Sequence, residues 1–266
     1  LTHLDNCYFI KSLKAIGYVC KTNIVSNTAF RGFGGPQGML TIENILYSVS
    51  QYLQKPIDEI RKINYYSKLN GLKTPYGQIV KNLRIDRILD EVYKLSDYEN
   101  RLRNINKFNL NQKANNLPFR KGIALMPAKF GISFNKPSLN QGGALVHVYS
   151  DGSIRLNHGG TEMGQGLFIK VAQVVAECFK VPLEQIHITS TNTAEVPNTS
   201  ATAASSGSDL NGMAAWNASN VIKNRMIDHA AKLFKKNKKD IVLSEGRIIC
   251  GNRSLSFSEL AFSCWE

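Results

Sequence analysis

The sequence has no long apolar run, no paired-cysteine motif and no His/Cys cluster with the spacing of a zinc site. A transmembrane helix needs about 20 apolar residues, so none is expected. Five cysteines are scattered without a CxxC pair. This argues against a disulfide framework and against an iron–sulfur cluster held by this chain. Free thiols suit a reducing compartment, so we expect a cytoplasmic protein. His147 and His158 are too far apart for a simple metal pair, and no metal ligand is predicted.

Acidic residues are scarce, with 20 Asp and Glu against 33 Lys and Arg and a formal net charge of +13. Such a balance suits a nucleic-acid binder, whose DNA affinity would fall steeply with salt. The lysines are diffuse, however, except for a group at the end of a predicted helix, where cations complement the helix dipole. That group is Lys232, Lys235, Lys236, Lys238 and Lys239. An acidic partner subunit or an anionic cofactor would need the same charge, so no nucleic-acid partner is expected.

Residues 28–38 form the first of three junctions rich in small residues. Three glycines there permit positive φ and close approach to a ligand. Arg31 offers a rigid donor fork that suits an oxyanion. Pro36 favours the first turn of the helix that follows. A loop at a helix N-terminus can bind an anion, although a structural loop with a surface arginine is an open alternative.

The second and third junctions repeat this arrangement. Residues 158–166 follow a predicted strand and precede a helix. Residues 198–209 carry small and hydroxyl side chains before a long helix, with Ser208 or Asp209 as the expected N-cap. Helix N-termini leave unpaired N–H donors, so three such ends would encircle one elongated anionic ligand. The alternative for the third junction is a low-complexity linker.

Hydrophobic periodicity predicts alternating helices and short strands. Helices are expected at 36–53, from 56, at 84–95, within 101–116, from 167 to Pro182, at 209–236 and at 256–261. Extended runs or strands are expected at 18–25, 119–126, 130–134, 142–149, 153–157, 185–191 and, as a hairpin, 241–250. Hairpins in place of regular βαβ units predict an α+β fold with mixed short sheets and packed helices. We expect two regions, a first cofactor loop with a helical part at 1–117 and a second cofactor-binding region at 118–266.

Several motifs occur in the order of one known family. They are Ala29-Phe30-Arg31-Gly32-Phe33-Gly34-Gly35-Pro36-Gln37, Lys129 to Phe134, Leu139 to Tyr149, Gly159 to Gly166 and Val196 to Ser205. On these motifs the chain resembles the molybdopterin-binding subunit or domain of xanthine dehydrogenase and the aldehyde oxidases. The resemblance covers most of the chain and is densest from 118 to 215. The abrupt start and end of the sequence predict a piece of a larger molybdopterin-binding domain, truncated at both ends.

The resemblance implies which residues meet the molybdenum cofactor and the substrate. The implied cofactor-binding residues are Arg31, Gly32, Gly164, Gln165, Thr202, Ala203, Ala204 and Ser205. Phe33 and Phe134 would sandwich a heteroaromatic substrate, with Asn135 beside the pocket. The alternatives are core aromatics, a helix-capping role for Gln165 and a surface salt bridge for Arg31. Glu162 is expected to be structural, since a glutamate in the first turn of a helix is explained by the helix dipole.

The implied reaction is hydroxylation of a purine carbon with oxygen from water. Electrons would leave through 2Fe–2S clusters to FAD and NAD on other domains or subunits of a homodimer or heterotetramer. The general base of the family lies downstream of this sequence, so no catalytic residue is predicted within it and the isolated chain is expected to be inactive. Asn135 and Lys136 depart from the family pattern and leave the substrate open. The alternatives are an aldehyde oxidase or a non-catalytic scaffold for the cofactor.

Overall fold

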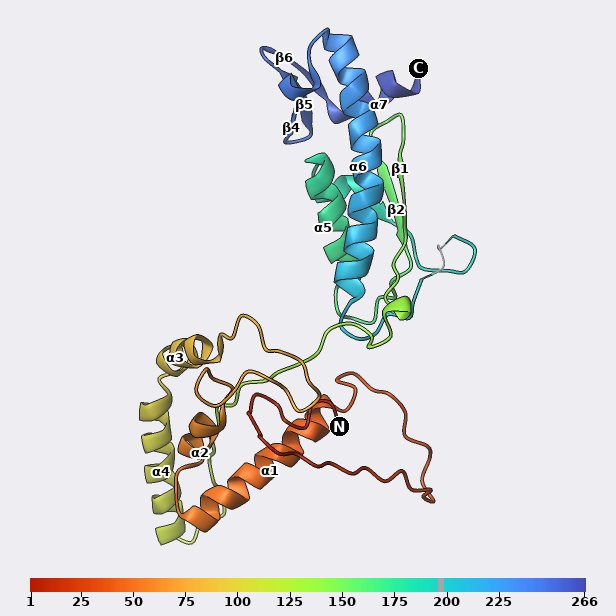
Figure 1. Cartoon of the computed structure of the whole chain (residues 1–266). Helices are drawn as coiled ribbons and strands as arrows, with labels where there is room; N and C mark the ends of the chain where they lie inside the picture. The colour runs from red at the N-terminus through yellow and green to blue at the C-terminus, as the bar shows by residue number, and fades with distance from the viewer. Residues whose placement is uncertain (196–198) are drawn as a thin grey trace. The chain divides into compact units, whose positions relative to one another are not determined.

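The computed structural model describes residues 1–195 and 199–266, and it divides into two compact units, Leu1–Phe130 and Gly131–Glu266 (Figure 1). Each unit has its own cluster of buried apolar side chains. Mixed helices and short sheets confirm the predicted α+β class. The predicted regions 1–117 and 118–266 concern cofactor contacts and stay a prediction. None of the helices in the described residues combines the length and apolarity needed to cross a bilayer.

The first unit is helical. Its helices are α1 (Gly35–Leu53), α2 (Ile57–Asn64), α3 (Ile85–Leu95) and α4 (Tyr98–Ala114). Ile42 and Leu46 lie one turn apart on α1 and bury their side chains against Tyr8 and Ile60. The predicted helices at 36–53, from 56 and at 84–95 are confirmed, because their apolar residues recur at helical spacing.

A buried ion-pair network ties α1 to α2. Arg61 is 8 % exposed and lies 2.8 Å from a Glu43 carboxylate oxygen and 3.0 Å from one of Asp58. The hydroxyl of Tyr8 donates to the same Glu43 carboxylate. Every charge in this network therefore has a partner, as a charge buried away from water requires.

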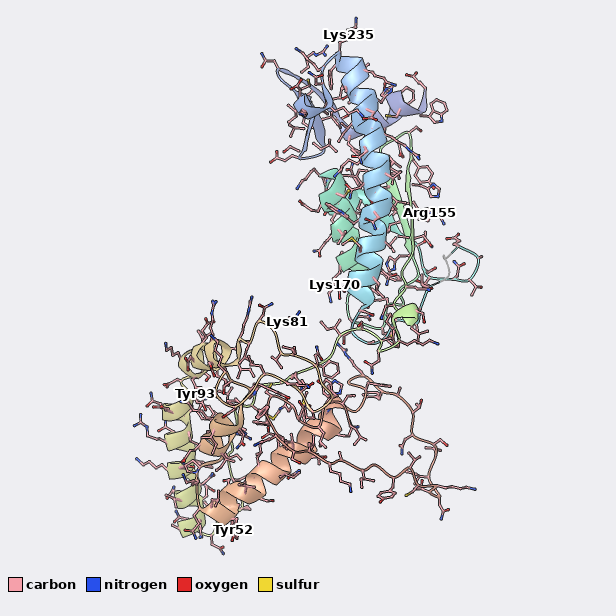
Figure 2. The ribbon with its side chains drawn as sticks, viewed as in Figure 1. Tyr52, Lys81, Tyr93, Arg155, Lys170 and Lys235 are labelled. Carbon is pink, nitrogen blue, oxygen red and sulfur yellow. The ribbon has the colours of Figure 1, made fainter. Side chains whose placement is uncertain are left out.

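In its described residues, the second unit contains two three-stranded sheets and three α-helices. Its elements are η1 (Pro137–Leu139), β1 (Ala144–Val148), β2 (Ile154–His158), α5 (Leu167–Phe179), η2 (Leu183–Gln185), β3 (Ile186–Ile188), α6 (Gly207–Phe234), η3 (Lys238–Asp240), β4 (Val242–Ser244), β5 (Arg247–Cys250), β6 (Arg253–Ser256) and α7 (Phe257–Trp265). β1 pairs antiparallel with β2, and β2 pairs parallel with β3. β4, β5 and β6 form an antiparallel meander. α5 packs along α6, and Lys235 lies at the C-terminal end of α6 (Figure 2).

One continuous core joins the two sheets of this unit. Leu156 of β2, Leu167 of α5, Ile248 of β5 and Phe257 of α7 are each at most 1 % exposed and belong to the same cluster. The last helix begins with a capping box, in which Ser256 accepts from the Glu259 amide and Glu259 accepts from the Ser256 amide. The long helix α6 packs against β1 and β2 and also contacts η3 and α7. Its N-terminal end lies beside the loop that follows β2, where Asn211 lies next to Gly160.

The prediction of a strand at 18–25 is wrong. Residues 18–25 are exposed and unpaired by any strand of the described residues, and Val19 is fully exposed. Apolar, β-branched residues favour a strand only when a second backbone pairs with them, since strand propensity reflects packing against neighbours.

The segment 119–134 forms no strand among the described residues, and its backbone turns at Ser133, which has a φ of 74°. The side chain of Asn6 holds part of this segment instead. Its amide donates to the Pro127 carbonyl at 3.0 Å and its oxygen accepts from the Lys129 amide at 3.0 Å. The expected N-cap of α6 is also wrong, because the helix begins at Gly207 with Ser206 as N-cap.

Candidate functional site

The first junction is a tight turn that leads into α1. Phe33 donates its amide to the Phe30 carbonyl and Gly35 donates to Gly32, both at 2.8 Å. Gly32, Phe33 and Gly34 all have positive φ, at 97°, 45° and 80°. Phe33 is 76 % exposed and is therefore not part of the core of the first unit. Arg31 is exposed and makes no ion pair among the described residues, so its guanidinium is available to a ligand.

Gly35 serves packing, in contrast to the expectation that it allows a ligand to approach. A Cβ on Gly35 would lie 2.5 Å from the Phe130 ring. Phe130 in turn stacks on His3, with ring centroids 4.6 Å apart and planes inclined by 20°. The motif Lys129 to Phe134 therefore begins against the first glycine loop, within the first unit.

The second junction satisfies its own helix end. The Glu162 carboxylate accepts the backbone N–H groups of Gly164 at 2.8 Å, Gly166 at 3.0 Å and Phe168 at 3.1 Å. The hydrogen bonds from Phe168, Gly166 and Gly164 lower the pKa of this carboxyl, although desolvation raises it. Glu162 therefore holds the end of α5, but from four residues before the N-cap Gly166 and not, as was expected, from the first turn. The Glu162 carboxylate thus already occupies the N-terminus of α5, whereas the sequence predicted that this helix end would be open to a ligand.

Gln165 lies in the same loop and keeps part of its hydrogen-bonding capacity. Its side-chain oxygen accepts from the Met163 amide at 2.6 Å, and its Nε2 donates to the Thr161 carbonyl at 2.9 Å. An amide nitrogen carries two hydrogens, so one remains for a ligand. Gly164 next to it has φ +88° and open space where a side chain would project.

The third junction leads into α6 through a strained backbone of small residues. Ala204 and Ser205 have φ of 56° and 57°. Ser206 provides no side-chain cap for α6, and no side chain of the described residues accepts from the first amides of this helix, although Asp209 places a carboxylate in its first turn. The part of the predicted junction motif at Val196, Pro197 and Asn198 lies outside the described residues.

Hydrogen bonds join three of the predicted loops within the second unit. The Thr161 amide donates to Thr202 Oγ1 at 2.8 Å, and the Ser133 amide donates to the Ala204 carbonyl at 2.8 Å. Asn140 then fixes Phe134, because its side chain accepts from the Phe134 amide at 2.8 Å and donates to the Phe134 carbonyl at 3.0 Å. Phe134 is half-buried and Asn135 is exposed. The implied residues 134, 164–165 and 202–205 thus lie on connected loops, while Arg31, Gly32 and Phe33 belong to the first unit.

Backbone strain is concentrated on the predicted loops. Among the described residues, most non-glycine positions with positive φ have ordinary explanations: they are Asn or Asp, helix C-caps, or Glu245 in a hairpin turn. The four that remain are Phe33, Ser133, Ala204 and Ser205. Each such residue costs on the order of 1–3 kcal/mol, and residues of this kind cluster at ligand sites.

The residue that sequence reasoning missed is His158. It ends β2, is 1 % exposed, and its Nδ1 accepts from the Gly160 amide at 3.1 Å. Burial lowers its pKa. A histidine directly before two glycines at the end of a strand is the sequence signal that marks this position.

The features of this site fit an elongated anionic ligand with a planar part. The uncapped end of α6 suits a phosphate, since helix N-termini attract anions. The free amide hydrogen of Gln165, the open face of Gly164 and the small side chains at 203–205 let a ligand approach the backbone.

Comparison with known proteins identifies relatives that bind such a ligand, the molybdopterin cofactor. Family models described as molybdopterin cofactor-binding domains match residues 1–65 and 91–266. The chain is 47 % identical over 238 residues to xanthine dehydrogenase/oxidase of Rattus norvegicus, covering 90 % of this chain and 17 % of that protein. It is 45 % identical over 234 residues to a nicotinate hydroxylase of Emericella nidulans, covering 87 % of this chain and 17 % of the relative. The chain therefore spans only about a sixth of the length of these relatives.

Solved structures share the fold at low sequence identity. CO dehydrogenase from Oligotropha carboxidovorans gives a TM-score of 0.64 at 18 % identity, over 87 % of this chain and 30 % of its own. Quinoline 2-oxidoreductase from Pseudomonas putida 86 gives 0.62 at 16 % identity, over 89 % and 31 %. The chain belongs to the molybdopterin cofactor-binding domain family.

Proposed function

We propose that this chain is the molybdenum cofactor-binding portion of a xanthine dehydrogenase-like hydroxylase that oxidises hypoxanthine and xanthine with oxygen from water. The observation that carries the proposal is the pair of hydrogen bonds Ser133–Ala204 and Thr161–Thr202. They connect the loop of the proposed substrate residue Phe134 to both loops proposed to hold the cofactor.

Backbone groups and small polar side chains would hold the cofactor. Gln165 would donate its free amide hydrogen, and Thr202 would donate its hydroxyl hydrogen, since its oxygen already accepts from Thr161. Residues 203–205 would present backbone groups to the phosphate end, followed by the first amides of α6. Arg31 and Gly32 of the first loop would add a charged donor fork and close backbone approach. Bound molybdenum supplies the two-electron oxidation chemistry, and the chain supplies position and electrostatics.

Phe33 and Phe134 would hold the planar substrate, with Asn135 beside it. Aromatic rings pack on a heteroaromatic plane in stacked or edge-on geometry. The exposure of Phe33, an aromatic that a core would otherwise bury, supports this role. Lys136 is exposed one residue further on, so a basic side chain would favour substrates rich in oxo groups or carrying negative charge.

The remaining parts of the reaction are proposed to lie outside this chain. They are the general base, the 2Fe–2S clusters and the FAD site, on other domains or subunits of a cytoplasmic homodimer or heterotetramer. We therefore expect the isolated chain to show no hydroxylase activity. Turnover of hypoxanthine by the isolated, cofactor-loaded chain would contradict this expectation.

A second candidate is hydroxylation of another substrate by the same chemistry. The fungal relative of similar identity is a nicotinate hydroxylase, so a charged pyridine ring is a specific alternative to a purine. An aldehyde is the third candidate substrate. The alternative to an enzyme is a non-catalytic scaffold that holds the cofactor.

The test is the substrate profile of the full-length polypeptide that contains this chain. It is purified, its molybdenum and pterin contents are measured, and kcat/KM is determined for hypoxanthine, xanthine, nicotinate and benzaldehyde. We expect stoichiometric pterin and the highest kcat/KM for the purines. A preference for nicotinate or benzaldehyde would replace the purine assignment. Absence of pterin would contradict the cofactor assignment itself.

In the same protein, Lys136→Ala should raise KM for xanthine and nicotinate more than KM for neutral benzaldehyde. Equal KM values before and after the substitution for charged and neutral substrates would remove Lys136 from the site.

A further inference from the structure

Gly160 of the second junction is held by side chains on both sides of its backbone. Its N–H donates to His158 Nδ1 at 3.1 Å, and its carbonyl accepts from Thr191 Oγ1 at 2.7 Å. The position has no room for a side chain, because a Cβ there would lie 2.5 Å from Leu167 Cδ2 and 2.9 Å from Asn211 Nδ2. Gly160 is thus a fixed point from which the glycine loop leaves the sheet.

The two proposed cofactor contacts depend on the next residue. The amide of Thr161 donates to Thr202 Oγ1 at 2.8 Å, and its carbonyl accepts from Gln165 Nε2 at 2.9 Å. One peptide unit therefore separates the fixed Gly160 from the groups that orient Thr202 and Gln165. A shift of Gly160 would displace both.

The hydrogen bond to Gly160 also determines the state of the His158 ring. A backbone N–H can only donate, so Nδ1 is unprotonated and a neutral ring carries its hydrogen on Nε2. Nε2 is buried without a hydrogen-bond partner among the described residues, while the ring packs edge to face with Phe168 at a centroid distance of 5.2 Å. The acceptor at Nδ1 is thus the one polar function that this imidazole serves here, and an unpaired buried donor is tolerated to keep it.

We propose that His158 is a positioning residue for the molybdopterin site, which acts through Gly160 and Thr161 to set the orientation of Gln165 and Thr202. This inference rests on the proposed function of the chain. The acceptor at the position of Nδ1 is the essential feature, and neither charge nor metal ligation is involved.

Two substitutions separate the acceptor from the bulk of the ring. His158→Phe keeps a planar ring against Phe168 but leaves the Gly160 amide buried without an acceptor. His158→Asn is smaller, yet its Oδ1 is three bonds from Cα, as Nδ1 is, and can accept the same hydrogen bond. Thr191→Val is nearly isosteric and removes the hold on the Gly160 carbonyl. Ile248→Ala removes buried volume from the same core in β5 and serves as the matched control for stability.

The experiment measures pterin content, the rate of pterin release during incubation in mild denaturant, and the separate values of kcat and KM in the full-length polypeptide. We expect His158→Phe to release pterin about tenfold faster than the unsubstituted protein. A change of this size lies within the free-energy cost of leaving a buried hydrogen-bond donor without a partner. Thr191→Val should shift release in the same direction. His158→Asn should release pterin at close to the unsubstituted rate, although its smaller side chain lowers Tm.

The outcomes distinguish a failure of this inference from a failure of the proposed function on which it rests. Release from His158→Phe no faster than from Ile248→Ala at equal loss of Tm would show that His158 only stabilises the fold and would overturn the inference. The inference would also be overturned if His158→Asn released pterin as fast as His158→Phe while Thr191→Val released it at the unsubstituted rate. An unsubstituted protein without pterin would instead refute the proposed function, and the inference with it.

Discussion

Ala204 and Ser205 adopt positive φ although neither is glycine, and they lie where the chain turns into α6. Left-handed backbone costs a side-chain-bearing residue roughly 1–2 kcal/mol. No helix C-cap or Asx turn explains this cost. A loop that must hold one shape for a ligand explains why it persists, since strain of this kind survives only where the surroundings determine the conformation.

Replacing Ala204 by glycine should relieve this strain. We expect Ala204→Gly to raise the free energy of unfolding by about 1 kcal/mol, measured by urea denaturation of the chain. Its neighbour is the control. Ala203 is exposed with ordinary φ, so Ala203→Gly should lower the free energy of unfolding by about 0.5–1 kcal/mol through added freedom of the unfolded chain. Equal effects of the two changes would show that the loop is not strained.

The contact between Gly35 and Phe130 makes a second prediction. Gly35→Ala places a methyl group 2.5 Å from the Phe130 ring, so either the ring or the start of α1 must move. Overpacking of this kind costs about 1–3 kcal/mol of unfolding free energy. Phe130→Leu in the same chain should recover part of the loss, which a double-mutant cycle would detect. Additive effects of the two substitutions would show that the ring does not limit position 35.

At the scale of the element, the charged state of Glu162 should stabilise the N-terminus of α5. Its pKa is lowered in the folded chain, so the unfolded chain binds a proton first as the pH falls. The stabilisation is therefore complete above the ordinary pKa of 4.5 and is lost as the pH falls through the lowered value. We expect Glu162→Gln to lower Tm at pH 7 and to have the same Tm as the unsubstituted chain once Glu162 is protonated.

The control for this prediction is Glu184→Gln, which removes a carboxylate from η2 where no backbone amide bond to it occurs among the described residues. Its effect on Tm at pH 7 should be small. A Tm difference for Glu162→Gln that stays constant from pH 7 to pH 3 would mean that charge at the helix end is not the cause.

Elements with a regular hydrophobic period could be predicted from the sequence. The 36–53 helix and the 142–157 hairpin match α1, β1 and β2 within a few residues, because each has one apolar face and clear turn residues at its ends. The segments at 18–25 and 119–134 could not be predicted this way. The first segment pairs with no strand of the described residues. Part of the second is held by the single side chain of Asn6, and sequence pattern does not reveal such a partner.

The candidate site was predictable only in part. The loops carrying Arg31, Gln165 and residues 202–205 were identifiable from glycines, small residues and family motifs. The roles of Gly35 and His158 required coordinates, because both depend on a neighbour far away in sequence or on a hydrogen bond to a backbone amide. That Glu162 fills the end of α5, while Ser206 provides no side-chain cap for α6, likewise follows from geometry rather than from pattern.

For the whole molecule, the second unit should fold without the first. Its core cluster runs from Val146 to Ala261, wholly inside residues 131–266. We expect a fragment of residues 131–266 to give a cooperative thermal transition by circular dichroism and dispersed amide resonances. A fragment without a cooperative transition would show that its core needs residues from the first unit.

The carboxylate of Glu162 competes with free anions for the N-terminal amides of α5, and it is tethered to them by the chain. It is four residues from the N-cap Gly166, so its local concentration at the helix end is set by a short tether and not by the surrounding solution. A free anion would have to exceed that effective concentration to displace it. Changes in cellular phosphate or nucleotide levels should therefore leave the α5 end untouched.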